Sequence, residues 1–299
     1  MIRKHESVSS FEYLPRNMQR LPPLHHSALM GNTKRLGELL SPDSTIASSV
    51  DTYGRTALHV AASHGVYNSL KVLCKSCSKE TLDRADCYRF TALHYAVQGA
   101  NTYCAKLLLE AGSDVNPTQQ TLYTPLHLAA LYGYPELVAL LCQHGADVHA
   151  RTLSLETPLQ MATRSGIRIR ERLKLHYTTM ALLLKFGSDV KVQDNEGTTP
   201  LHHVAMHCER VQCAALLCAA GANVGCRNYG NVTAVQVAHG EEVRRLLRRL
   251  QTTPLRLEHF CLLVIRERLG TYLRTKAEKL PLPTPLKDKI LFKTLPRVI

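Results

Sequence analysis

Histidine and cysteine are the side chains of this 299-residue chain whose types and spacing could support metal binding or proton transfer. Five histidines stand at the same place in a recurring phrase: His25, His59, His94, His127 and His202. Imidazoles bind metals and exchange protons near neutral pH, so a regular set of them needs an explanation. Their shared position favours one structural role that is repeated five times.

The ten cysteines are spread along the chain without the spacing of a disulfide framework. Cys142, Cys213 and Cys218 fall at apolar helical positions, where a reduced thiol packs as a small hydrophobic group. Cys74 and Cys77 form a C-x-x-C pair, but no second Cys/His pair lies at the spacing that a closed zinc site requires. We therefore expect reduced thiols and no bound metal.

The histidines belong to a longer repeat, the phrase Thr-Pro/Ala-Leu-His/Gln. Its clear copies begin at Thr56, Thr91, Thr124, Thr157 and Thr199. Successive copies are 35, 33, 33 and 42 residues apart, so the period is 33 with one insertion of nine residues. Degenerate copies near Pro23 and at Thr233 make seven units. Such a period is typical of a solenoid, in which stacked units bury a core that no single unit has.

The phrase at this period resembles the ankyrin repeat, and the remainder of each unit agrees with it. Each unit has an apolar second helix that ends at a glycine, as at Gly112, Gly145, Gly187 and Gly221, where a left-handed residue is expected. The resemblance implies an all-α solenoid of about seven repeats over residues 21–250, after an N-terminal leader at 1–20, with a concave protein-binding surface.

Two features of the repeats carry specific expectations. In ankyrin repeats the shared histidine is expected to satisfy backbone polar groups of the turn, as buried polar groups require. The turn glycine seen at Gly54 and Gly197 is replaced by Arg89 and Leu122, and we expect those two turns to differ locally. No Ser/His/Asp or Cys/His arrangement and no phosphate-binding glycine loop occurs, so we expect no catalytic residue and no cofactor.

The insertion lies in the fifth repeat, between Gly166 and the apolar run that begins at Met180. The steps between Ile169, Leu173, Met180 and Leu184 predict a second helix lengthened at its N-terminal end, with these residues facing inward. Arg168, Arg172 and Lys174 would then point outward, as candidate substrate-binding residues. The simpler alternative is a solvated helical face with no specific partner.

The C-terminal segment begins after a basic helix, Val243 to Leu250, that we expect to cap the array. Pro254 can start a new helix because its missing N–H is not needed there. Within that helix Leu257, Cys261 and Ile265 recur in steps of four, which places them on one face suited to a partner's groove. The alternative is an ordinary amphipathic helix that covers the end of the solenoid.

This segment, residues 251–299, resembles a SOCS box, with Arg256 as a departure because the family usually has Ser, Thr or Pro there. The resemblance implies that Leu257, Cys261 and Ile265 contact elongin C. It also implies that the stretch Leu280, Pro281, Leu282 and Pro283 selects a cullin of the five type, since two prolines fix an extended loop at low entropic cost.

Together the two resemblances imply a non-catalytic adaptor of an E3 ubiquitin ligase. The box would bind elongins B and C and a cullin with its RING-box subunit, while the repeats hold an unknown protein substrate. A non-ligase interaction scaffold is the alternative. The net charge of +13 gathers towards the C-terminus, but the aromatic platforms of nucleic-acid binding are missing. No segment has the length to span a membrane, so we expect a cytoplasmic protein that also enters the nucleus.

Overall fold

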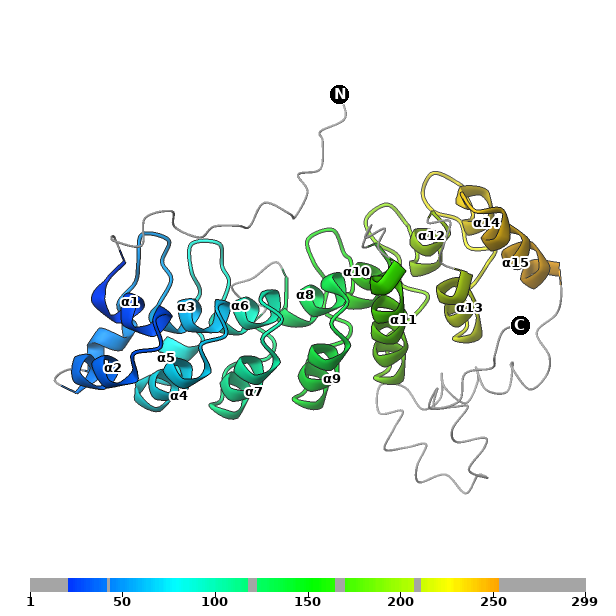
Figure 1. Cartoon of the computed structure of the whole chain (residues 1–299). Helices are drawn as coiled ribbons and strands as arrows, with labels where there is room; N and C mark the ends of the chain where they lie inside the picture. The colour runs from blue at the N-terminus through cyan, green and yellow to red at the C-terminus, as the bar shows by residue number, and fades with distance from the viewer. Residues whose placement is uncertain (1–20, 42–43, 118–122, 165–169, 207–210, 253–299) are drawn as a thin grey trace, which may run out of the picture.

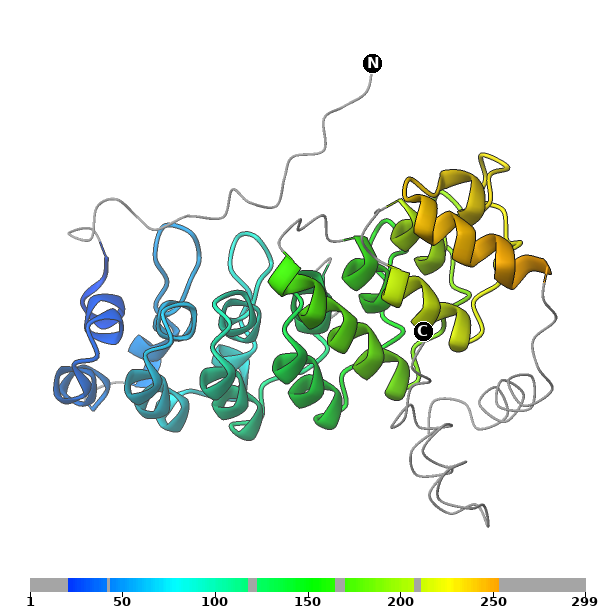
Figure 2. The same cartoon turned by 45° about the vertical axis from the view of Figure 1, so that its right-hand side comes forward.

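The computed structural model describes residues 21–41, 44–117, 123–164, 170–206 and 211–252. These residues form seven pairs of antiparallel helices stacked side by side into an elongated array (Figure 1). The first helices make one layer and the second helices the other, as the turned view also shows (Figure 2). The predicted all-α repeat architecture is confirmed for this part of the chain.

The helices alternate between the two layers in chain order. The first helices are α1 Pro23–Leu29, α3 Ala57–Ser63, α6 Ala92–Gln98, α8 Pro125–Tyr132, α10 Pro158–Arg164, α12 Pro200–Ala205 and α14 Ala234–Val237. The second helices are α2 Thr33–Leu40, α4 Tyr67–Ser76, α7 Thr102–Glu110, α9 Pro135–Gln143, α11 Arg170–Lys185, α13 Val211–Ala219 and α15 Glu241–Thr252. Two short helices, η3 Ser44–Ser48 and α5 Lys79–Leu82, lie in the connections that follow α2 and α4. We call the loop that joins each second helix to the next first helix a finger.

The core is a continuous row of aliphatic side chains between the layers. The leucine of the repeated phrase is at most 1% exposed in the five clear copies, for example Leu58 and Leu126. Leucines of the second helices, such as Leu70 and Leu141, are fully buried against it. Burial of each such side chain contributes about 2 kcal/mol. Neighbouring repeats share this core, so each pair depends on the next for its stability.

Glycine ends the second helices as predicted. Gly112, Gly145, Gly187 and Gly221 have φ angles of 92°, 86°, 97° and 99°, in the left-handed region that costs other residues free energy. Each glycine follows the last helical turn and redirects the chain into the next finger. The prediction of glycine helix ends is therefore confirmed.

The expectation that the turn at Arg89 differs from its counterparts is wrong. Arg89 has a φ of 66°, close to the 74° of Gly54 and the 73° of Gly197. Its N–H donates to the carbonyl of Asp86 at 2.9 Å, as the N–H of Gly54 donates to that of Asp51 at 3.0 Å. Stacking against neighbouring fingers holds the backbone in one shape, and the arginine adopts a strained conformation to fit it. Leu122 lies outside the described residues.

Leu155 occupies the same turn position in the fifth repeat, with a φ of 59°. The left-handed conformation costs an L-residue about 1–2 kcal/mol, whereas glycine loses only about 0.5–1 kcal/mol more backbone entropy on folding. We therefore expect Leu155→Gly to raise the free energy of unfolding by about 0.5–1 kcal/mol, measured by urea denaturation. Asn231→Gly is the control, because asparagine tolerates its φ of 60° at the equivalent position. A lower denaturation midpoint for Leu155→Gly would contradict the strain.

The fifth repeat contains the longest helix of the described chain. Helix α11 has 16 residues, compared with 9 in the neighbouring α9 and α13. It begins level with the first-helix layer and runs down through the second layer (Figures 1 and 2). Met180 and Leu184 face the core at 0% and 3% exposure. The predicted N-terminal lengthening is thus confirmed, although Ile169 is not described and nothing is known of the Leu173 side chain.

Helix α15 closes the array, as the sequence predicts. Val243 and Leu247 are fully buried against the preceding repeat, while Arg245 is exposed. Arg244 is only half-exposed, because it donates to the carbonyl of Ala238 and to Glu241. Among the residues that the structure describes, no helix combines the length and apolarity needed to cross a membrane.

Candidate substrate-binding surface

The repeated histidines are helix caps within the core. In the fourth repeat the Thr124 N–H donates to Nδ1 of His127 at 3.1 Å, and Nε2 of His127 lies 3.1 Å and 3.2 Å from the carbonyls of Ala150 and Glu156. One imidazole therefore satisfies the start of its own helix and the base of the next finger. The same contacts occur at His59, His94 and His202. This confirms the predicted structural role at these four positions, while His25 has only the finger contact, from Nε2 to the carbonyl of Arg55 at 2.7 Å.

These contacts fix the imidazoles in the neutral form. Nδ1 must accept from a backbone N–H, so the proton lies on Nε2, which donates to a carbonyl. Burial lowers the pKa of His59, His94 and His127 to about 4, against the partly opposing effect of the carbonyl hydrogen bonds. Both ring nitrogens are occupied, so these histidines are not available as metal ligands or proton carriers.

Glutamine takes the place of histidine in two repeats. Oε1 of Gln160 accepts from the Thr157 N–H at 3.0 Å, and its Nε2 donates to the carbonyl of Thr198 at 2.9 Å. Gln236 accepts from the Thr233 N–H in the same way at 2.8 Å. The amide of Gln160 therefore makes the same two hydrogen bonds as the neutral imidazole. Its oxygen accepts from the N–H at the helix start, and its nitrogen donates to a carbonyl of the next finger.

The C-x-x-C pair has the properties of buried thiols. Burial raises the pKa of Cys74 to about 12 and that of Cys77 to about 11, so both stay protonated at neutral pH. A protonated thiol is a poor metal ligand and a poor nucleophile. Cys213 and Cys218 are buried and Cys142 is half-buried, in agreement with thiols that pack as hydrophobic groups.

Three of the described fingers are each held by an aspartate that points inward. In the second, third and sixth repeats Asp51, Asp86 and Asp194 each accept two N–H groups of their own turn at 2.8–2.9 Å. Their second oxygens bind Arg55, Tyr95 and His203 respectively. The carboxylates of Asp51, Asp86 and Asp194 therefore bind groups of the protein itself and are not available to a partner.

Two side-chain pairs, Glu156 with Arg164 and Asp194 with His203, lie close together where the fifth repeat meets the sixth. Nη1 of Arg164 lies 2.9 Å from both oxygens of Glu156, whose side chain is 3% exposed. Nε2 of His203 lies 3.1 Å from Oδ2 of Asp194. Burial alone would raise the pKa of Asp194, but hydrogen bonds from His203 and from two backbone N–H groups lower it overall. The first pair links one finger base to α10, and the second links the next finger base to α12.

Glu156, Asp194 and His203 bring one potential ligand atom each within 4.8 Å of one another. Their donor types suit a divalent cation, but the guanidinium of Arg164 already binds both oxygens of Glu156 and would lie beside the ion. The guanidinium of Arg164 therefore offsets the charge of Glu156. We interpret the cluster as a structural connection between repeats.

The extra turns of α11 end where the regular repeat resumes. In the third repeat Asn101, ten residues after Thr91, donates to the carbonyls of Ala62 and Ser63 in the preceding repeat. Counted without the nine extra residues, His176 is its counterpart, and a side chain added at Gly133 would come within 2.9 Å of its ring. The insertion therefore adds helix without moving the contacts between repeats.

The predicted site residues lie mostly beyond the described part of the chain. Outside it are Arg168 and the box residues Leu257, Cys261, Ile265, Leu280, Pro281, Leu282 and Pro283. For Arg172 and Lys174 the structure gives the backbone of α11 alone. They are two residues apart in a continuous helix, so they occupy different sides of it. The recurring aspartate five residues before the threonine was a signal that our sequence analysis did not use.

Comparisons with known protein families agree with this architecture. A three-copy ankyrin-repeat model matches residues 7–83, 24–119 and 77–152, and a many-copy ankyrin model matches residues 174–218. Together these matches cover more than half of the chain. A SOCS-box model matches residues 253–290, directly after α15.

Individual relatives match parts of the repeat region. Ankyrin repeat protein nuc-2 of Neurospora crassa is 33% identical over 110 residues, which is 37% of this chain and 10% of that protein. The nuclear factor NF-kappa-B p105 subunit of Gallus gallus is 30% identical over 209 residues, 69% of this chain and 17% of that protein. A probable E3 ubiquitin-protein ligase, XBOS31 of Oryza sativa subsp. japonica, is 34% identical over 119 residues, 38% of this chain and 25% of that protein. The chain spans a quarter or less of the length of these relatives.

Two solved structures have the same fold. The human ASB11 ankyrin repeat domain superposes with a TM-score of 0.66 at 24% identity, covering 78% of this chain and all of that domain. The ankyrin repeat domain of Bcl-3 gives a TM-score of 0.63 at 26% identity, with 76% of this chain and 98% of that domain covered. The stacked helix pairs described above are thus an arrangement known from experiment.

Proposed function

Since this chain belongs to the family of ankyrin-repeat proteins with a SOCS box, we propose that it is a substrate-recognition adaptor of a cullin-type RING ubiquitin ligase. The observation that carries the proposal is the SOCS-box match over residues 253–290, placed directly after a repeat array. Ankyrin repeats followed by a SOCS box are typical of non-catalytic adaptors. Such an adaptor contributes proximity, because it holds the substrate beside the charged ubiquitin carrier.

The box divides into two segments with separate partners. We assign Leu257, Cys261 and Ile265 to elongin C, which binds elongin B, and Leu280 to Pro283 to a cullin of the five type with its RING-box subunit. The repeats hold the protein substrate for ubiquitination and degradation, and the cytoplasm and nucleus are the locations where these partners would be met.

Affinity purification of the intact protein beside a variant lacking residues 254–299 tests the adaptor role. We expect elongins B and C, cullin and the RING-box subunit to be recovered with the intact protein and to be missing from the truncated one. Substrates should remain with both, because the repeats are unchanged. No recovery of the ligase subunits with the intact protein would favour a non-ligase scaffold, and equal recovery with both proteins would show that residues 254–299 are not their binding site.

Replacing Leu280, Pro281, Leu282 and Pro283 by alanine should separate the two partners. We expect cullin recovery to fall about tenfold or more while elongin C recovery is unchanged, because the variant loses apolar anchors and the prolines that fix the loop. Quantitative immunoblotting of both partners from one purification measures this. Loss of elongin C together with cullin would mean that the two segments do not act separately.

The basic residues of the insertion are a candidate contact for the substrate. Arg168, Arg172 and Lys174 add three positive charges that no other repeat has at this place. Their field would raise the encounter rate with an acidic segment and would weaken with salt. When all three residues are changed to glutamate, affinity purification should recover less of an acidic substrate and as much elongin C as before. An unchanged set of bound proteins would make this helix extension purely structural.

A further inference from the structure

The finger tips display charged and large apolar side chains to solvent. We define the finger-tip surface as the six residues before the threonine of repeats 2, 3, 5, 6 and 7, at 50–55, 85–90, 151–156, 193–198 and 227–232. The carboxylates of Asp51, Asp86, Glu156 and Asp194 point inward, as described above. Three arginines, Arg89, Arg151 and Arg227, are exposed on these tips against one exposed acid, Glu196. On this finger-tip surface the outward-facing charge is therefore positive.

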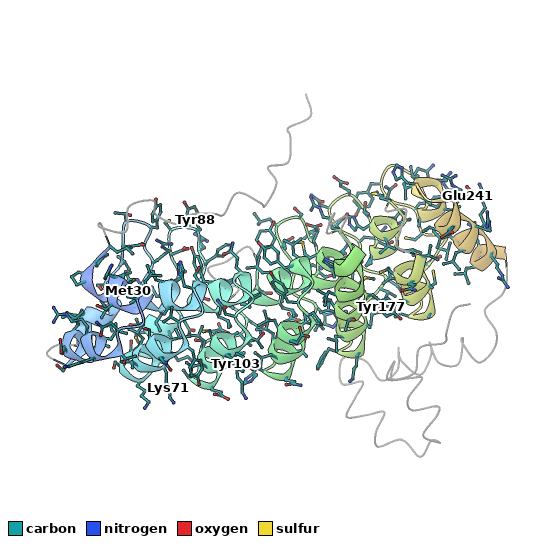
Figure 3. All side chains as sticks on the ribbon, in the orientation of Figure 1. Met30, Lys71, Tyr88, Tyr103, Tyr177 and Glu241 are labelled. Atoms are coloured by element: carbon teal, nitrogen blue, oxygen red, sulfur yellow. The ribbon has the colours of Figure 1, made fainter. Side chains whose placement is uncertain are left out.

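Large apolar side chains lie beside these arginines. Leu153 is 76% exposed, Leu155 44% and Tyr229 75%, and Tyr88 is 41% exposed at the upper end of its finger (Figure 3). Leucine and tyrosine have no reason to face water at a turn, where smaller polar residues are ordinarily found. Exposed apolar residues mixed with arginine are the composition of a protein-binding surface.

The fingers of repeats 5 to 7 are held in fixed positions. The N–H of Asn195 donates to the carbonyl of Ser154 at 3.1 Å, and the N–H of Tyr229 donates to that of Glu196 at 3.0 Å. The Tyr229 ring also packs on Gly197, where any Cβ would come within 2.7 Å of it. A partner that binds these tips would not have to order them first, which lowers the entropic cost of binding.

We propose that the fingers of repeats 5 to 7 bind an extended segment of the protein substrate that carries two large apolar residues flanked by acidic ones. This inference rests on the proposed adaptor function and specifies its substrate class. One apolar residue would contact Leu153 and Leu155 and the other Tyr229, with acidic residues next to Arg151 and Arg227.

The geometry sets the spacing of the segment. Packed helices lie about 8–10 Å apart, so fingers two repeats apart are separated by about 16–20 Å. An extended chain covers this distance in about five or six residues, at about 3.3 Å per residue. The middle of the segment crosses the sixth finger, where exposed Asn195 and Glu196 favour a polar or basic residue. A protein segment is favoured over single-stranded nucleic acid, because Leu153 and Leu155 offer no ring for stacking and Glu196 repels phosphate.

Selection from a displayed library of random peptides, long enough to span three repeats, tests the proposal on the full chain. We expect the enriched peptides to be acidic, with two large apolar residues about five or six positions apart. A variant with Leu153→Ser, Tyr229→Ser, Arg151→Glu and Arg227→Glu should bind them at least about tenfold more weakly. The matched control carries Tyr103→Ser and Arg245→Glu, which change exposed residues of the same kinds away from the fingers.

The outcomes are distinguishable from failure of the adaptor role. Thermal unfolding that matches the unaltered chain would show that the finger variant folds, and retained elongin C binding would show that the box acts independently. Enrichment of basic peptides, equal binding by both variants, or tighter binding of oligothymidylate than of any peptide would overturn the proposal. If the unaltered chain does not bind elongin C, the proposed adaptor function is wrong. Selection of acidic peptides whose binding depends on the fingers would still support the proposed binding surface.

Discussion

Changing Leu257 and Cys261 together to glutamate is expected to remove elongin C from the purified protein. Both positions belong to the stripe that recurs in steps of four within the SOCS-box match. Apolar residues at the centre of an interface cost about 2 kcal/mol or more each when lost, so two of them correspond to roughly a thousandfold weaker binding. Burying two carboxylates in an apolar groove adds a further penalty. Pull-down with purified elongins B and C measures the loss.

The control places the same kind of charge on the opposite side of the predicted helix. His259 and Arg266 are two and nine residues from Leu257, which is about 180–200° around a helix. The variant His259→Glu with Arg266→Glu should retain elongin C. Thermal unfolding of both variants should match the unaltered protein, because the repeats form their own core. If the two double variants lose elongin C equally, the stripe is not the contact.

Replacing His127 is expected to produce the largest loss of stability among single changes in the repeats. His127→Ala leaves the Thr124 N–H and the carbonyls of Ala150 and Glu156 without this partner and opens a cavity in the core. Unsatisfied buried polar groups cost about 1–3 kcal/mol each, so we expect the free energy of unfolding to fall by about 3–5 kcal/mol. Urea denaturation followed by circular dichroism measures the change.

His127→Gln is the matched comparison, because Gln160 makes the same contacts in the next repeat. We expect it to cost less than about 1 kcal/mol. An equal cost for alanine and glutamine would show that ring packing, and not hydrogen bonding, explains the histidine.

The His127 variants also show how much this histidine contributes to the loss of stability at acid pH. The pKa of His127 is about 4 in the fold and near 6.5 when unfolded, so unfolding takes up a proton between these values. The contribution of His127 to the free energy of unfolding is therefore complete above pH 6.5. It falls by about 1.4 kcal/mol per pH unit as the pH is lowered towards 4. His59 and His94 act in the same direction. His127→Gln should therefore lose less stability than the unaltered protein between pH 6.5 and 4.5.

Features that recur in the sequence could be predicted, and those that occur once could not. The period placed each Thr and His correctly at a helix start, because the same contacts repeat in every unit. The pair of Glu156 and Arg164 escaped prediction, since the other described repeats have no equivalent of it. Arg89 was predicted wrongly because neighbouring fingers, which its local sequence does not reveal, determine its backbone.

The location of the insertion has a consequence for how such proteins diversify. The extra residues enter after the first helix of the fifth repeat and before His176, which resumes the regular contact with Gly133. Neither neighbouring repeat has to adjust to the added length. Mutation and selection can therefore alter this segment while the array stays folded, and protein engineers could graft a reporter or a recognition peptide there without redesigning the repeats on either side.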